Sequence, residues 1–367
     1  MIYNITIIAG ARPNFMKIAP IIHAIKNAKL QGEPLDYRLV HTGQHYDNNM
    51  SGSFFQQLEI PMPDANLECS GGTQAEQTAA ILVAFEKELL ANPAHLVLVV
   101  GDVTSTMACA LVAQKLQIKV AHVEGGIRSC DWTMPEEINR LVTDSITNYF
   151  FTTSKLANQN LLNAGNSESQ LFFVGNTMID TLLKQRPKFK RPKIWKTLKL
   201  SEKSYFILTL HRPANVDQQS QLKTMIDEIM SHTKDLSVVF PVHPRTAKIL
   251  DRLQVKHPRL HQVPPLSYLE FNYLVERAKA VITDSGGITE EASVLRVPCL
   301  TLRDNTERPE TIELGTNVLV GTNPKNIQSH LEVLFAGQWK KGCDIPLWDG
   351  HAATRIVDAI LSLKNLN

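Results

Sequence analysis

The chain has 367 residues, too many for a single hydrophobic core, so two domains are expected. Apolar residues make up 43% and charged residues 20%, which is ordinary for a soluble globular enzyme. The 38 basic residues nearly balance the 36 acidic ones, and the net charge of +2 argues against a general nucleic-acid or membrane binder, although a few Arg and Lys could still meet an anionic ligand. No segment is apolar for long enough to be a signal peptide or a membrane span. Five cysteines without a CxxC pair predict a reduced, cytoplasmic protein without structural disulfides.

The first half of the chain alternates short β-branched runs with longer helical stretches. Helical spacing is found, for example, over 15–28 and 73–90. Because strands that alternate with helices form parallel sheets covered on both faces, this pattern predicts an α/β domain. The strands are expected at ITIIAG (5–10), YRLVHTG (37–43), HLVLVVG (95–101), KVAHVEGG (119–126), YFFTTS (149–154) and LFFVGN (171–176).

A basic, proline-punctuated stretch over 184–199 follows, and we interpret it as an interdomain connection rather than a nucleic-acid-binding tail. The alternation then restarts, and a helix over 353–367 with one apolar face ends the chain. The sequence therefore predicts an α/β protein with two Rossmann-like domains facing a central cleft: an N-terminal domain (1–183), a C-terminal domain (184–350) and a C-terminal helix (351–367) packing back on the N-terminal domain. Ligands of open parallel sheets bind beyond the carboxyl ends of the strands.

Two strand-to-helix junctions are candidate phosphate sites. Arg12 and Lys17 flank the first, and Ser285, Gly286 and Gly287 form the second, ahead of Glu290 and Glu291. Glycines allow close approach to a ligand, and a helix start offers N–H groups and positive potential to a diphosphate. The SGG segment could instead form only a tight turn. Arg12, Arg303 and Arg308 could likewise be ordinary surface charges. Neither junction matches GxGxxG or the Walker lysine loop, so neither NAD nor ATP is indicated.

Ionisable residues at other strand ends and helix starts are candidates for acid–base chemistry. Placing an ionisable residue directly after a buried strand costs free energy, so solubility alone does not explain such a residue. Glutamates in the first turn of a helix, by contrast, often only favour the helix dipole, and this is our preferred interpretation of Glu137. His243 is either a ligand contact or a packed histidine, and no His and Cys spacing resembles a metal site. The candidates are Asp102, Glu124, Glu136 and His211 with Arg212, joined by Gln44 and His45.

Taken together and in order, these motifs resemble the non-hydrolysing UDP-N-acetylglucosamine 2-epimerases. The resemblance covers roughly residues 4 to 321, and it is the joint order of individually weak motifs that makes it specific. They read GARPNFMKIAP, HTGQHYD, GDVTST, HVEGGIRS, MPEEINR, GNTMID, LHRPANV, FPVHP, TDSGGITEEA and RDNTERPETIELGTNVLVG.

The resemblance implies a glycosyltransferase-B-like fold, a UDP-sugar substrate between the domains, no metal or other cofactor, and a homodimer without nucleic-acid or membrane partners. The implied reaction inverts carbon 2 of UDP-N-acetylglucosamine to give UDP-N-acetylmannosamine by elimination and readdition of UDP. The implied acid–base residues are Asp102, Glu124 and Glu136, with His211 at the reacting end. The implied substrate-binding residues are Arg12, Lys17, Gln44, His45, Phe271, Ser285, Gly286, Gly287, Glu291 and Arg308.

The chain also departs from the family pattern. Members regulated by their own substrate carry an Arg-Gln pair in the region of residues 70–79, where this chain has Thr73-Gln74 and Glu76-Gln77 and lacks that Arg. The usual substrate activation is therefore not expected.

The identity of the sugar has an alternative. The segment RSCDWTMPEEINR (128–140) resembles a branch that includes enzymes for UDP-2,3-diacetamido-glucuronate, so that compound remains an alternative substrate. A UDP-sugar glycosyltransferase, a hydrolysing epimerase and a non-enzymatic sensor are further alternatives, and the three carboxylates favour epimerisation.

Overall fold

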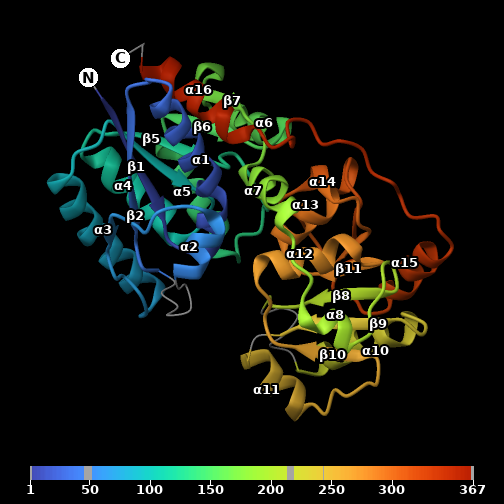
Figure 1. Cartoon of the computed structure of the whole chain (residues 1–367). Coiled ribbons are helices and arrows are strands. Elements are labelled where there is room, and N and C mark those ends of the chain that lie inside the picture. Colours follow the sequence, from blue (N-terminus) through green and yellow to red (C-terminus); the bar gives the residue numbers. More distant parts are fainter. Residues whose placement is uncertain (1, 45–51, 213–218, 243, 365–367) are drawn as a thin grey trace. The chain divides into compact units, whose positions relative to one another are not determined.

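The computed structural model describes residues 2–44, 52–212, 219–242 and 244–364. The chain separates into two compact units, Met1–Thr181 together with Pro346–Asn367, and Leu182–Ile345. Each unit is built on one parallel sheet with helices around it (Figure 1).

The first unit holds a 7-stranded sheet in the order β3-β2-β1-β4-β5-β6-β7, in which neighbouring strands are parallel. Its strands are β1 (Tyr3–Ala9), β2 (Leu35–His41), β3 (Ala65–Asn66), β4 (Leu96–Val100), β5 (Lys119–Val123), β6 (Tyr149–Thr152) and β7 (Leu171–Phe173). Its helices are α1 (Arg12–Leu30), α2 (Gly52–Leu58), α3 (Gln74–Ala91), α4 (Thr104–Lys115), α5 (Pro135–Ile146), α6 (Lys155–Asn163), η1 (Glu168–Gln170), α7 (Thr177–Gln185, which runs into the second unit) and α16 (Ala352–Lys364).

Apolar residues on both faces of this sheet explain its central position. Every residue of β4 is buried, as expected for a parallel strand covered by helices on both sides. Helix α3 buries Ile81, Phe85 and Leu89, which recur every four residues and so lie on one face of the helix. These side chains join Val97 and Val99 of β4 and apolar residues of α4 in one hydrophobic core on this face of the sheet.

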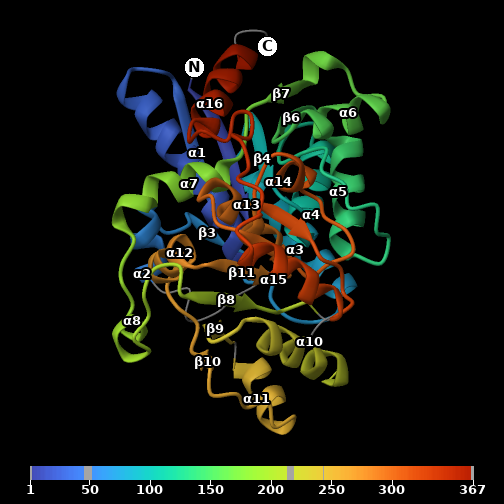
Figure 2. The ribbon, with the colours of Figure 1, turned by 90° about the vertical axis from the view of Figure 1, so that its right-hand side faces the viewer.

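The C-terminal helix α16 completes the first unit. It lies beside α1, at the opposite end of the sequence (Figure 1 and Figure 2). Its first turn is held by Asp180 of α7, whose carboxylate accepts hydrogen bonds from the backbone N–H groups of Ala352 (3.1 Å) and Ala353 (2.7 Å). A carboxylate in this position satisfies N–H groups that have no partner inside the helix and also favours the helix dipole.

The second unit holds a 6-stranded parallel sheet in the order β10-β9-β8-β11-β12-β13. Its strands are β8 (Tyr205–Thr209), β9 (Ser237–Pro241), β10 (Leu260–Val263), β11 (Ala280–Thr283), β12 (Cys299–Thr301) and β13 (Asn317–Leu319). Its helices are η2 (Arg186–Lys188), α8 (Lys193–Thr197), α10 (Gln219–His232), α11 (Pro244–Arg252), α12 (Tyr268–Arg277), α13 (Gly286–Val294), α14 (Pro309–Glu313) and α15 (Asn326–Phe335).

Both sheets reverse their strand order at one point, between β1 and β4 in the first unit and between β8 and β11 in the second. Ligands of open parallel sheets bind beyond the carboxyl ends of the strands at such a switch point. Just beyond the carboxyl ends of these four strands lie Arg12, the first residue of α1, and Asp102, His211 and Ser285. The topology thus places predicted site residues at the expected edge of each sheet.

The predicted α/β fold with two Rossmann-like domains is confirmed, and every predicted strand is present in the described residues. The two-residue strand β3 was not predicted, because so short a segment carries no periodicity. Residues 184–199 include η2 and α8 and belong to the second unit. There, Arg191 donates to the Tyr273 hydroxyl (2.9 Å) and lies 5.8 Å from the ring centroid of Trp195.

Candidate active site

Asn14 fixes the loop between β1 and α1, the first predicted phosphate site. Its Oδ1 accepts hydrogen bonds from the backbone N–H groups of Gly10 (3.0 Å) and Ala11 (2.9 Å). Its Nδ2 donates to the carbonyl oxygen of Val100, at the end of β4 (3.2 Å). This buried side chain therefore joins the two strand ends at the switch point. Asn14 was not predicted from the sequence, although an amide side chain at the start of a helix whose N-cap is Ala11 was a signal for such a role.

Gly10 is required by close packing inside the protein. A Cβ there would lie 2.2 Å from Ser105 Oγ. Ser105 in turn donates from its backbone N–H (3.0 Å) and its hydroxyl (2.7 Å) to Oε1 of Gln44. Gln44, a predicted substrate residue, is thus bound to the start of α4 next to the β1 loop. His45 lies outside the described residues, as does His243.

Lys17 of α1 and Glu124, directly after β5, form an ion pair. Lys17 Nζ lies 2.7 Å from Glu124 Oε2, and the side chains are 14% and 3% exposed. Glu124 has a φ of 71°, a left-handed conformation that non-glycine residues seldom adopt and that often marks functional positions. The predicted nucleotide-binding lysine and a predicted acid–base residue are therefore in direct contact.

Asp102 follows β4 and is held by Arg140 of α5. Arg140 Nη2 forms a close ion pair with Asp102, and the side chains are 7% and 30% exposed. The Asn139 side chain donates to the backbone carbonyl of Asp102 (2.9 Å). A buried guanidinium thus orients a carboxylate that stays accessible, as proton transfer to a ligand requires.

The two glutamates at the start of α5 have different environments. Glu136 is exposed, whereas Glu137 is buried and accepts hydrogen bonds from Ser129 N and Oγ (both 2.9 Å) and from Cys130 N (3.2 Å). Burial by itself would raise the pKa of Glu137, but the hydrogen bonds from Ser129 and Arg140 outweigh it and lower that pKa. Glu137 therefore does more than favour the helix dipole, because it fixes the loop ahead of α5.

His122, on β5, is a buried residue that the sequence analysis did not single out. Its Nδ1 lies 2.7 Å from Asp144 Oδ1 and its Nε2 lies 2.7 Å from the carbonyl oxygen of Gly101. Asp144 also accepts from Arg128 (2.6 Å) and from the backbone N–H of Gly126 (3.0 Å). Burial by itself would raise the pKa of Asp144, but His122 and Arg128 lower it. This network joins the ends of β4 and β5 to α5. It therefore lies next to Asp102, which follows Gly101, and to Glu124, which follows β5.

Residues 70–79, where regulated family members carry the Arg that this chain lacks, contain the start of α3. Thr73 is the N-cap of α3: its Oγ1 accepts from Glu76 N (3.2 Å), and Glu76 Oε2 accepts from Thr73 N (2.7 Å), a capping box. Gln77 Nε2 donates to the carbonyl oxygen of Gln44 (3.2 Å). The absence of the usual substrate activation stays a prediction.

The three arginines with open roles have different environments. Arg12 is exposed. Arg303 is buried and makes two contacts with Glu307, at 2.8 Å and 2.9 Å, and Arg308 is buried and forms a close ion pair with Glu290. Arg303 and Arg308 are therefore not surface charges.

In the second unit, Asp284 binds His211 and was missed by the sequence analysis. His211 Nδ1 lies 2.7 Å from Asp284 Oδ1. The carboxylate also accepts from the backbone N–H groups of His211 (3.0 Å) and Arg212 (2.9 Å). The His211 side chain is 61% exposed, whereas that of Asp284 is 0% exposed. A buried carboxylate thus orients an accessible imidazole at the switch point of this sheet.

The second predicted phosphate site opens α13, beside this pair. Ser285 is the N-cap residue of the helix, but its side chain does not cap it; its backbone N–H donates to Thr283 Oγ1 (3.0 Å). Ser285, Gly286 and Gly287 are all partly exposed. The start of α13 is therefore accessible to a ligand.

Glu291 of α13 is buried and accepts a hydrogen bond from the Tyr268 hydroxyl (2.7 Å). Burial raises the pKa of Glu291 to about 7, although the hydrogen bond from Tyr268 lowers it. Phe271, the residue expected near a uracil ring, lies partly exposed on the same helix as Tyr268.

The raised pKa of Glu291 predicts how stability depends on pH. The unfolded carboxyl titrates near 4.5 and the folded one near 7, so the folded state binds more protons between these values and stability falls as pH rises through that window. We expect Glu291→Gln to flatten the fall in melting temperature between pH 5 and pH 7, whereas Glu332→Gln, at an exposed position, should leave the slope unchanged. Equal slopes for all three proteins would contradict this prediction.

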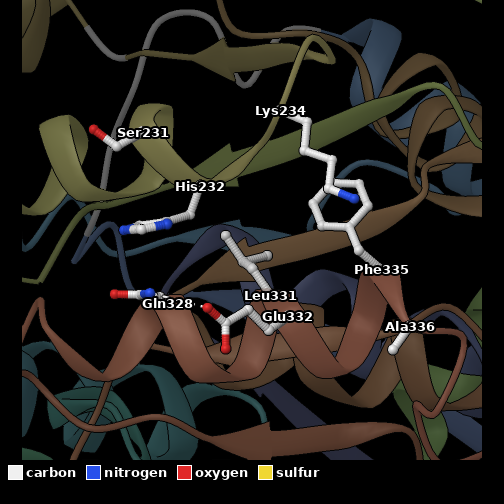
Figure 3. Close-up of a pocket in the computed structure, with 8 residues that line it drawn as sticks. All are labelled: Ser231, His232, Lys234, Gln328, Leu331, Glu332, Phe335 and Ala336. Carbon is white, nitrogen blue, oxygen red and sulfur yellow. Dashed lines mark hydrogen bonds between the residues drawn. The ribbon is translucent and has the colours of Figure 1, made fainter.

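A pocket of about 480 Å³ lies elsewhere in the second unit, between α10 and α15 (Figure 3). Lys234 Nζ lies 4.3 Å from the ring centroid of Phe335, a cation–π contact. None of the residues that line this pocket is a predicted site residue, so the pocket has no part in the site described above.

Metal clusters and membrane-spanning helices are both absent from the described residues. No group of three or more His, Cys, Asp or Glu in this part of the chain could hold a metal ion. No helix within the same ranges has the length and apolarity needed to cross a membrane.

Comparison with known proteins identifies the family. A family model described as UDP-N-acetylglucosamine 2-epimerase matches residues 28–361. The UDP-N-acetylglucosamine 2-epimerase of Methanocaldococcus jannaschii is 41% identical, over 96% of this chain and 98% of that protein. Its crystal structure in complex with UDP-GlcNAc and UDP has a TM-score of 0.86 and 40% identity, covering 98% of this chain and 99% of that one.

Two further comparisons bear on the alternatives. The UDP-2,3-diacetamido-2,3-dideoxy-D-glucuronate 2-epimerase of Pseudomonas aeruginosa is 40% identical, over 87% of this chain and 88% of that protein. A glycosyltransferase from Rickettsia africae has a TM-score of 0.55 at 13% identity, covering 100% of this chain and 97% of that one, and shows a shared fold alone. The order of motifs, the two parallel sheets and the near-complete coverage agree, and the chain belongs to the UDP-N-acetylglucosamine 2-epimerase family.

Proposed function

We propose that this chain is an isomerase that interconverts UDP-N-acetylglucosamine and UDP-N-acetylmannosamine by elimination and readdition of UDP. Membership of the family, with near-complete coverage of an epimerase 41% identical, is the observation that carries this proposal. The pairing of carboxylates with buried cations in the first unit supports it.

The chemistry explains why such residues are needed. The hydrogen on carbon 2 is not acidic, because no carbonyl is attached directly to that carbon. A base that removes this proton while the bond from carbon 1 to the diphosphate oxygen breaks produces 2-acetamidoglucal and UDP. Protonation of carbon 2 on the opposite face, with return of the UDP oxygen to carbon 1, then gives the epimer. Two proton-transfer groups and a site for the departing diphosphate are required.

The described residues meet these requirements in our assignment. Asp102, Glu124 and Glu136 act as the acid–base groups, and His211 acts at the reacting end. The start of α13 would receive the diphosphate, because helix N-termini attract anions. The remaining substrate contacts are assigned to Arg12, Lys17, Gln44, Phe271, Glu291 and Arg308. No metal or nucleotide cofactor takes part in this scheme.

Incubation with UDP-N-acetylglucosamine in deuterated water tests the proposed reaction. We expect NMR to show deuterium at carbon 2 of the recovered sugar nucleotides, with no net release of UDP and no loss of rate when a chelator is added. The Asp102→Asn variant serves as the matched control and should incorporate deuterium far more slowly. Stoichiometric release of UDP would instead identify a hydrolysing epimerase.

The sugar that the enzyme prefers is a separate question, because a relative 40% identical is named for a diacetamido-glucuronate. We propose UDP-N-acetylglucosamine as the substrate. A panel that includes UDP-2,3-diacetamido-glucuronate, compared by kcat/KM, would identify the alternative if that compound reacted faster.

We further propose that the protein is a cytoplasmic homodimer that supplies a UDP-acetamido sugar for polysaccharide biosynthesis. All five cysteines lie in described parts of the chain and are free, which suits a reducing compartment. The homodimer is implied by the resemblance, and light scattering after gel filtration would measure the mass.

A further inference from the structure

The pair formed by His211 and Asp284 carries an inference beyond the proposed function, on which it rests. We propose that Asp284 is a positioning residue that fixes the ring orientation and the tautomer of His211, so that Nε2 is presented to the reacting sugar nucleotide as a proton acceptor.

The contacts of Asp284 define its charge state. Its carboxylate is 0% exposed and accepts from the backbone N–H groups of both His211 and Arg212. A backbone N–H can only donate, and a carboxylate that accepts several such bonds is held in its ionised form. Asp284 therefore offers a lone pair, not a proton, to the Nδ1 atom 2.7 Å away.

This charge state determines the histidine tautomer. A neutral imidazole carries one N–H, and the nitrogen that faces an ionised carboxylate must be the one that bears it. With Nδ1–H donated to Asp284, Nε2 has the free lone pair. The His211 side chain is 61% exposed, so the Nε2 side of the ring can reach a ligand while the Nδ1 side is fixed against the sheet.

The position of the pair in the fold connects it with the reaction. His211 follows β8 and Asp284 follows β11, the two strands at the switch point, and their last residues are joined by a hydrogen bond between the Thr209 and Thr283 hydroxyls (2.6 Å). Asp284 also directly precedes Ser285 and the start of α13. The carboxylate that orients the His211 ring thus lies in the segment that leads into the proposed diphosphate site.

Replacing Asp284 by Asn gives a sharp test, because the two residues have the same shape. The Asn carbonyl would keep the bonds from the two backbone N–H groups, and its NH₂ group would face Nδ1. The ring would then have to accept at Nδ1 and carry its proton on Nε2, the opposite tautomer. We expect kcat to fall about 10²–10⁴-fold, the range for lost acid–base catalysis, with KM changed less than about threefold.

A double-mutant cycle separates this role from a structural one. In a His211→Asn background, Asp284→Asn should lower kcat by less than about threefold, because its effect passes through the ring. The matched control is Asp304→Asn: Asp304 also accepts from a backbone N–H, that of Thr322 (2.9 Å), in the same unit, and this variant should retain the parent kcat. An equal loss with and without His211 would overturn the proposal.

The tautomer can be measured without any activity. In protein labelled with ¹⁵N-histidine and free of ligand, the His211 signals, identified by their absence from His211→Asn, should show the proton on Nδ1 in the parent and on Nε2 in Asp284→Asn. The same tautomer in both proteins would refute the proposal even if epimerase activity were present. An inactive parent with the expected tautomer change would contradict the proposed function alone.

Discussion

Replacing Asp102 by Asn should lower kcat by about 10²–10⁴-fold, because the amide keeps the size and most hydrogen bonds of the carboxylate but cannot exchange a proton with the sugar. The same loss is expected for Glu124→Gln, and Glu136→Gln should behave similarly. The ion pair with Arg140 holds Asp102 at a 30% exposed position, so the amide that replaces its carboxylate should occupy nearly the same place. Initial rates with UDP-N-acetylglucosamine, followed by NMR, measure the effect.

Glu137→Gln is the control for this series. Glu137 is buried against Ser129 and Arg140, so its loss should affect the loop before α5 and lower kcat less than the Glu136 change does. If Asp102→Asn kept full activity, its assignment as acid or base would be wrong. If Glu137→Gln were the more severe of the two glutamate variants, the acid–base role would belong to Glu137.

The largest effect on stability is expected from replacing Lys17 by Met. Lys17 and Glu124 are 14% and 3% exposed, so the change leaves a buried carboxylate with one cationic donor fewer, at a cost on the order of 3 kcal/mol. The same substitution at Lys29, also on α1, is the matched control. Its partner Asp36 lies at the same 2.7 Å, but the two side chains are 56% and 40% exposed, so the cost should stay below about 1 kcal/mol.

Hydrogen exchange of the α1 and β5 amides measures this effect within the first unit, which avoids the assumption that both units unfold together. Adding Glu124→Gln to Lys17→Met should recover part of the loss, because it removes the buried charge. Similar losses of protection in the Lys17 and Lys29 variants would show that burial does not strengthen the first pair.

Sequence patterns predicted the fold well because they record local properties. The β-branched runs and the helical spacing reflect which residues within one strand or helix are buried, so a short stretch of sequence is enough to predict that element. The order of motifs indicated the family. Site residues at strand ends, such as Asp102 and His211, were found for the same reason, since the end of an apolar run is visible in the sequence. Their functional roles remain predictions.

The partners of these residues could not be predicted in the same way. Asp284 lies 73 residues from His211, and Glu124 lies 107 residues from Lys17. No periodicity connects positions so far apart, so each pair becomes visible only when the fold brings the two segments of the chain together. Asp284 was missed although it directly precedes SGG, because its neighbours suggested a phosphate site and not a histidine partner.

The return of the chain to its first unit has a consequence for synthesis. Residues 346–364 supply α16, which covers α1 and is held by Asp180, while the second unit, Leu182–Ile345, is continuous in sequence. As the ribosome produces the chain from its N-terminus, the second unit has all of its residues before the first has its last helix. The first unit therefore lacks α16 until the whole of the second unit has been made, and a nascent chain that stops near residue 345 leaves α1 without this neighbouring helix. Truncations that remove α16 therefore act on the unit that contains Asp102 and Glu124.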